Sequence, residues 1–117
     1  MTKGPASFAR SARLTRPAEY RRVFANAERA TSRSFTLLAC ANDLEYSRLG
    51  LAVSRKVASR AVVRNRIKRC VRESFRRQRL LMTGWDVVVL ARPAAANRSM
   101  GEMSAELDQL WNRLKRR

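Results

Sequence analysis

The stretch RNRIKRCVRESFRR, residues 64–77, constrains the fold of this chain most strongly. Seven of its fourteen residues are Arg or Lys, yet Ile67, Cys70, Val71 and Phe75 recur at three- and four-residue spacing. This spacing places the apolar side chains on one face of an α-helix, because a helix turns once every ~3.6 residues. The pattern therefore predicts a helix that packs one stripe against a core and presents cations over most of its remaining surface.

The charge of the whole chain argues against an ordinary solvated surface for this helix. The 117 residues include 26 Lys and Arg against nine Asp and Glu, a net charge of +17. From residue 46 to residue 85 there are twelve cations and one acid, Glu73. Like charges four residues apart destabilise a helix unless an anion neutralises them. The excess predicts a polyanionic partner, either nucleic acid or an anionic membrane.

A membrane is the weaker of these two partners. No stretch approaches the ~20 consecutive apolar residues that a spanning helix needs, so no membrane partner is expected. A basic protein that acts on a lipid surface remains an alternative, because it needs only large apolar side chains that are free of a core. Binding to vesicles would distinguish it.

The start of the chain differs in composition from the rest. Residues 1–13 are basic, rich in Ser and Ala and free of acid, which predicts a flexible basic arm before a single domain at residues 14–117. A mitochondrial transit peptide can have the same composition. Cys40 and Cys70, in a chain without histidine, are too few for a zinc site. We expect two reduced thiols in or beside the core of a cytoplasmic protein.

Two further helices are predicted, one near each end of the chain. The first begins near Pro17, which suits a first helical turn, with Thr15 as its cap. Its apolar face consists of Tyr20, Val23, Phe24 and Ala27. The last opens with a capping box formed by Ser99 and Glu102. Its apolar face consists of Met103, Leu107, Leu110, Trp111 and Leu114.

Three segments have the composition of β-strands. Residues 34–41 are rich in β-formers, and residues 85–92 carry a run of aliphatic side chains that predicts burial on both faces. Residues 48–54 alternate, and Gly50 and Ala52 leave one face so flat that a backbone or a helix could approach it closely. Residues 93–97 are expected to form a loop.

The order of these elements predicts an α+β or α/β sandwich with the sheet on one side and the helices on the other. We favour the α+β class: a single domain with a mostly four-stranded sheet and three helices, in the order α-β-β-(β)-α-β-α. Two or three strands are expected before the basic helix and one after it. The chain contains no internal repeat and no low-complexity tract.

The flanks of the basic helix decide between DNA and RNA. Ser59 is its expected cap, and we expect it to run to about Leu81, where Thr83 and Gly84 stop it. A strand is predicted only a few residues upstream, so the preceding helix of a helix-turn-helix has no place. Zinc-finger spacing and leucine heptads are also absent. RNA is therefore favoured, and guanidinium groups suit it because they bind phosphate bidentately.

The run ASRAVVRNRIKRCVRESFR, residues 58–76, resembles the signature of the bacterial ribonuclease P protein subunit. LGLAVSRKV before it, GWDVVVLARP after it and EYRRVF near the start agree, so the resemblance covers about residues 14–114. It implies a left-handed βαβ crossover in the sheet. It also implies binding to a large catalytic RNA that holds Mg²⁺ ions and cuts the 5′ leader from precursor tRNA.

The resemblance also implies roles for particular residues. The helix residues that it assigns to RNA binding are Arg64, Asn65, Arg66, Lys68, Arg69 and Arg72. A basic pair before the helix, Arg55 and Lys56, belongs to the same set. Tyr20 and Phe24 match aromatic residues that line a cleft for the single-stranded leader, although plain core packing also explains them. Leu38 stands where some members carry a tyrosine, which puts a stacking contact there in doubt.

No catalytic or metal-binding residues are predicted for the protein itself. It has no histidine, and its carboxylates form no cluster among polar partners; Glu102 and Glu106 are expected on an exposed helix face. We expect an accessory subunit that binds no cofactor, with catalytic RNA and precursor tRNA as partners. One alternative is a ribosomal protein of similar fold that has no role in tRNA processing. Another is a protein-only nuclease, which would need acidic metal ligands.

Overall fold

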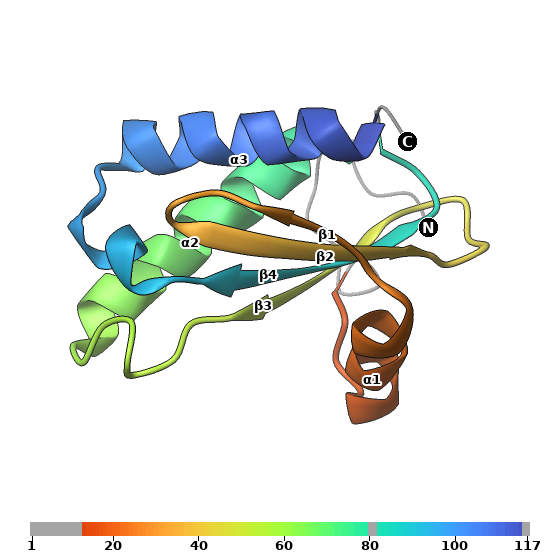
Figure 1. Cartoon of the computed structure of the whole chain (residues 1–117), viewed down its shortest axis with the longest axis horizontal. Helices are drawn as coiled ribbons and strands as arrows, with labels where there is room; N and C mark the ends of the chain where they lie inside the picture. Colours follow the sequence, from red (N-terminus) through yellow and green to blue (C-terminus); the bar gives the residue numbers. More distant parts are fainter. Residues whose placement is uncertain (1–12, 80–81, 116–117) are drawn as a thin grey trace, which may run out of the picture.

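The structure, a computed structural model, describes residues 13–79 and 82–115 (Figure 1). The expected basic arm therefore lies outside the described residues, except for Arg13, which forms a single parallel bridge with Leu49. The elements are α1 (Pro17–Asn26), β1 (Glu28–Thr31), β2 (Phe35–Ala41), β3 (Arg48–Ala52), α2 (Ala61–Gln78), β4 (Trp85–Ala91), a 3₁₀ helix η2 (Pro93–Asn97) and α3 (Met100–Lys115).

The four strands form one mixed sheet in the order β1-β2-β4-β3. β1 pairs with β2 and β2 with β4 in antiparallel fashion, whereas β3 and β4 are parallel neighbours. Parallel neighbours need a crossover, and α2 supplies it. The sheet and helices confirm the predicted α+β class; the left hand of the crossover stays an expectation of the resemblance.

The helices cover both faces of the sheet, which corrects the expectation that all of them lie on one side. α2 and α3 pack on one face and α1 lies against the other (Figure 1). The reason is that β4 presents apolar side chains on both faces of the sheet. Val87 and Val89 are buried in the larger core with α2 and α3, and Val88 is buried in a smaller cluster with Val23 of α1. A strand buried on both faces requires a layer on each side.

The apolar stripe of the basic helix is confirmed. Its buried residues are Ile67, Cys70, Val71, Ser74 and Phe75. All five residues predicted for the apolar face of α3 are buried as well, and Phe75 meets Trp111 edge to face with ring centroids 5.9 Å apart. Cys40 and Cys70 are free and buried, and burial raises the pKa of both thiols.

Several helix ends differ from the prediction. α1 is capped at Arg16 rather than Thr15, because the carboxylate of Glu19 accepts hydrogen bonds from the backbone N–H groups of both residues, at 2.9 and 3.0 Å respectively. α2 begins after Arg60 with no side-chain cap, so Ser59 does not serve that role. α2 ends at Gln78, earlier than expected, and the segment predicted as a loop is the 3₁₀ helix η2.

Two local predictions are confirmed by close contacts. Ser99 and Glu102 form the reciprocal capping box at the start of α3, with hydrogen bonds of 2.9 and 3.1 Å. The flat face of β3 is approached by α1: a Cβ atom on Gly50 would lie 2.7 Å from Cε1 of Tyr20. The ring of Tyr20 therefore occupies the space that Gly50 leaves open, because glycine has no side chain.

Candidate nucleic-acid interface

The basic surface of α2 lies opposite its buried stripe. Asn65, Arg66, Arg69 and Arg72 are exposed, and Arg64 and Lys68 are partly buried. The predicted basic pair, Arg55 and Lys56, is exposed in the turn that connects β3 to α2. Because the opposite side of α2 packs against the core, the cations point in a fixed direction, away from the buried stripe.

Two arginines of this surface also bind the protein's own backbone. The Nη1 group of Arg64 donates to the carbonyls of Ala58 and Ser59 at 2.9 and 2.8 Å. An Nη2 group of Arg66 donates to the carbonyl of Ala96 in η2 at 3.1 Å. A guanidinium carries five N–H donors, so each residue keeps donors for a phosphate. These two side chains thus fix the segments that flank α2, a role that the sequence did not indicate.

The aromatic residues of α1 divide between packing and exposure. Phe24 is 52% exposed, so core packing does not account for it. Tyr20 is half-buried against Gly50, and its hydroxyl donates to the carbonyl of Leu14 at 3.1 Å. Leu38, on the face of the sheet that α1 covers, packs against the same small cluster as Tyr20. The surface beside α1 is therefore apolar and partly open.

A small cavity joins this region to the basic helix. Its volume is about 110 Å³, and its lining includes Tyr20 from α1, Leu51 from β3 and Arg72 from α2. One predicted aromatic residue, Tyr20, and one predicted cation, Arg72, therefore line the same cavity.

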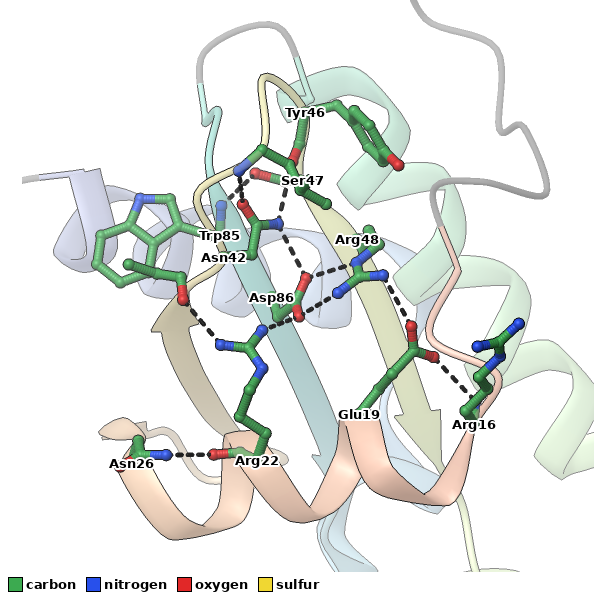
Figure 2. Close-up of polar contacts among 12 residues, drawn as sticks. Arg16, Glu19, Arg22, Asn26, Asn42, Tyr46, Ser47, Arg48, Trp85 and Asp86 are labelled. Atoms are coloured by element: carbon green, nitrogen blue, oxygen red, sulfur yellow. Dashed lines mark hydrogen bonds and ion pairs between the residues drawn. The ribbon is translucent and has the colours of Figure 1, made fainter.

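A buried ion cluster holds α1 on the sheet (Figure 2). The carboxylate of Asp86 in β4 is fully buried and accepts hydrogen bonds from Nε and Nη2 of Arg48 at 2.8 and 2.7 Å, from Asn42 at 2.9 Å and from Arg22 of α1. Nη1 of Arg48 also binds Glu19 of α1 at 2.7 Å. Two residues of α1 are thus tied to the cluster.

The cluster keeps Asp86 ionised. Burial alone raises the pKa of this carboxyl group, but the hydrogen bonds and charge of Arg48, together with Asn42 and Arg22, outweigh it, and the pKa lies below its usual value. The hydrogen bond to Asp86 in turn raises the pKa of Arg48. The only residue of α1 that is buried is Val23, so polar contacts carry much of the attachment of this helix.

One further carboxylate also accepts hydrogen bonds from the protein's own groups. Glu106, expected on an exposed face, instead accepts hydrogen bonds from the backbone N–H and the hydroxyl of Ser34 at 3.0 and 2.7 Å. It joins α3 to the start of β2.

Within residues 13–79 and 82–115, no group of three His, Cys, Asp or Glu side chains could hold a metal ion. No helix in the same part of the chain is long and apolar enough to cross a membrane.

Comparison with known proteins decides the family. The family model for ribonuclease P matches residues 8–115. The chain belongs to the ribonuclease P protein family. The ribonuclease P protein component of Thioalkalivibrio sulfidiphilus is 49% identical over 107 residues, which cover 92% of this chain and 89% of the relative. That of Nitrosococcus oceani is 45% identical over 104 residues, covering 89% and 87% respectively.

Solved structures of ribonuclease P proteins have the same fold. The Staphylococcus aureus protein superposes with a TM-score of 0.83 at 28% identity, covering 89% of this chain and 95% of that one. The Thermotoga maritima protein has a TM-score of 0.75 at 32% identity, covering 90% and 96%. This chain is thus the protein component of the ribonuclease P endoribonuclease, which acts in tRNA processing, and the family predicted from the signature is confirmed. Membership implies partnership with the ribonuclease P RNA and precursor tRNA.

Proposed function

We propose that the basic surface of α2, with the turn before it, binds the catalytic RNA of ribonuclease P. The residues are those predicted above: Arg55, Lys56, Arg64, Asn65, Arg66, Lys68, Arg69 and Arg72. The observation that supports this proposal is the difference between the two faces of α2. One face is buried along a stripe, and the other carries many cations and a single acidic residue, Glu73. Phosphate groups neutralise the repulsion between its cations, which would otherwise destabilise the folded protein.

The open apolar surface beside α1 binds the 5′ leader of precursor tRNA. Phe24 offers an exposed ring, and Tyr20 adds an aromatic edge to the same helix face. Aromatic faces stack on unpaired bases of any identity, which suits a leader of variable sequence. Leu38 lies nearby as an aliphatic contact and does not supply the tyrosine ring that some family members carry.

The protein contributes binding and the RNA contributes the chemistry. Three carboxylates, Glu19, Asp86 and Glu106, are each engaged by hydrogen bonds from the protein's own groups, so none is offered as a general acid or base. Mg²⁺ ions are held by the RNA, and the protein itself binds no cofactor. By holding the leader, the protein favours precursor tRNA over mature tRNA, which is selection by differential binding.

Reconstitution tests this division of labour. We expect no cleavage of precursor tRNA by RNA-free protein with Mg²⁺, and cleavage at the mature 5′ end once the cognate RNA is added. Cleavage by protein from which all RNA has been removed would overturn the proposal.

The leader contact has its own test in the Phe24→Ala variant. We expect the affinity of the holoenzyme for precursor tRNA to fall by about 1 to 3 kcal/mol, the free energy of one lost base stack, with little change for mature tRNA. Tyr46→Ala is the matched control, because Tyr46 is another exposed aromatic, in the turn between β2 and β3. If the affinity falls equally for both RNAs and the melting temperature falls with it, Phe24 contributes to packing and does not contact the leader.

A further inference from the structure

A groove runs between the N-terminal half of α2 and the start of α3. Its volume is about 650 Å³, within the range of pockets that hold small ligands. Its lining consists of Val62, Val63, Asn65, Arg66, Arg69 and Met100. No acidic residue is among them. The groove therefore combines an apolar surface, two guanidinium groups and one amide.

The apolar part of the groove is not explained by folding. Val62 is 63% exposed and Met100 is 41% exposed. Val62 lies outside the buried stripe of α2, on the surface that otherwise carries the cations. Phosphate binding does not explain it either, because an aliphatic side chain offers nothing to a phosphate. A ligand for this groove must have an apolar face as well as negative charge.

The walls of the groove are fixed before any ligand binds. Arg66 donates to the carbonyl of Ala96, and the Cys70 thiol lies 3.8 Å from the carbonyl oxygen of Met100. The capping box of Ser99 and Glu102 fixes the first turn of α3, where Met100 begins the helix. Both walls belong to helices that pack on the same core. A preformed site loses little conformational entropy on binding.

We propose that this groove binds one unpaired nucleotide of the catalytic RNA. A base has a flat apolar face and a polar edge, and its phosphate carries the charge. The face of the base lies on Val62 and Met100, the Asn65 amide bonds to its edge, and Arg66 and Arg69 neutralise the flanking phosphates. The amide suits this position because it both donates and accepts hydrogen bonds.

The inference rests on the proposed binding of the catalytic RNA by α2, and charge selects RNA over a protein segment. The net charge of +17 and the two guanidiniums in the groove favour a polyanion. A protein partner would have to bring an acidic apolar segment to a groove whose charged lining residues, Arg66 and Arg69, are both cations. The groove thus extends the predicted contact from phosphates to one base.

The test uses the double variant Val62→Ser, Met100→Ser in complex with the cognate catalytic RNA. We expect the dissociation constant to rise about tenfold, as partial loss of two apolar contacts predicts. The slope of log affinity against log salt should not change, because no phosphate contact is lost. Arg72→Ala, outside the groove, should instead lower that slope by about 0.7 to 0.9. Leu44→Ser is the apolar control, an exposed side chain in a distant turn that should change neither value.

Base-specific chemical probing of the RNA identifies the nucleotide. One base that the wild-type protein protects should become reactive in the double variant, while protection of the backbone elsewhere persists. An unchanged dissociation constant in the double variant, with Arg72→Ala still effective, would overturn the groove site and leave the proposed function intact. If Arg72→Ala also has no effect, the proposed function itself fails. The single variants Val62→Ser and Met100→Ser repeat the measurement should the double variant melt at a lower temperature.

Discussion

Replacing Asp86 with asparagine should loosen α1 from the sheet. The substitution preserves shape and removes the negative charge, so the guanidiniums of Arg48 and Arg22 lose their shared counter-ion. The carboxylate is fully buried, whereas the side chains of Arg48 and Arg22 are 19% and 41% exposed. Arg22 can therefore turn to solvent, and Arg48 keeps Glu19 at 2.7 Å. Arg48 should lose the most electrostatic stabilisation, since its guanidinium remains partly buried and has one charged partner fewer.

The expected loss of stability follows from that arrangement. Removing one partner of a buried ion pair costs about 3 to 5 kcal/mol, and the relief available to both arginines places Asp86→Asn near the lower end, at about 3 kcal/mol. For a domain of this size the melting temperature should fall by about 10 to 15 °C. Urea unfolding followed by circular dichroism measures the change. Glu73→Gln is the control, because its exposed pair with Arg76 should leave the urea midpoint unchanged.

The pH dependence gives an independent check on the same reasoning. The pKa of Asp86 is lower in the folded protein than in the unfolded chain, so its contribution to stability is present above the unfolded value of about 3.9. That contribution is lost as the pH falls through the folded pKa. The difference between wild type and Asp86→Asn should therefore shrink as the pH drops below about 4. A difference below about 1 kcal/mol at pH 7, or one that does not shrink in acid, would refute the argument.

Three further predictions follow from single contacts. Gly50→Ala should destabilise the fold by about 1 to 3 kcal/mol in urea unfolding, because its Cβ would lie 2.7 Å from the ring of Tyr20. Arg64→Ala should lower the salt slope of RNA binding by about 0.7 to 0.9, as Arg72→Ala does. Only Arg64→Ala should also lower the urea midpoint, since its side chain binds two backbone carbonyls. Trp111→Phe should cost about 1 to 3 kcal/mol in the same unfolding assay, because a buried serine hydroxyl loses its 2.8 Å donor.

Elements with strong periodicity could be predicted from the sequence because local spacing determines which side chains meet the core. The apolar stripe of α2 and that of α3 are examples, and each needs only its own helix to be recognised. The capping box of Ser99 and Glu102 is equally local. β1 was harder to predict from the sequence. Its four residues, ERAT, show no clear alternation of apolar and polar side chains, and it lies at the edge of the sheet.

The ion cluster could not be predicted, because its members are far apart in sequence. Arg22 lies 64 residues and Arg48 lies 38 residues from Asp86. The one available signal was an aspartate in the first half of an otherwise apolar strand, WDVVVLA. A carboxylate there needs partners, since a buried charge is costly when it is unpaired. The sequence indicates that partners exist, and only the fold shows that two of the groups tied to the cluster come from α1.

The candidate site shows a related limit of hydrophobic patterns. Val23 and Phe24 are neighbours in one apolar pattern, yet Val23 is fully buried and Phe24 is half exposed. α1 meets the sheet along a contact that is narrower than its apolar face. The same is true of α2, where the apolar residue Val62 lies outside the buried stripe. Isolated apolar residues at a surface are common and carry little information. Here Val62 lines a groove together with Arg66 and Arg69, and an apolar surface beside positive charge matches the two chemical parts of a nucleotide.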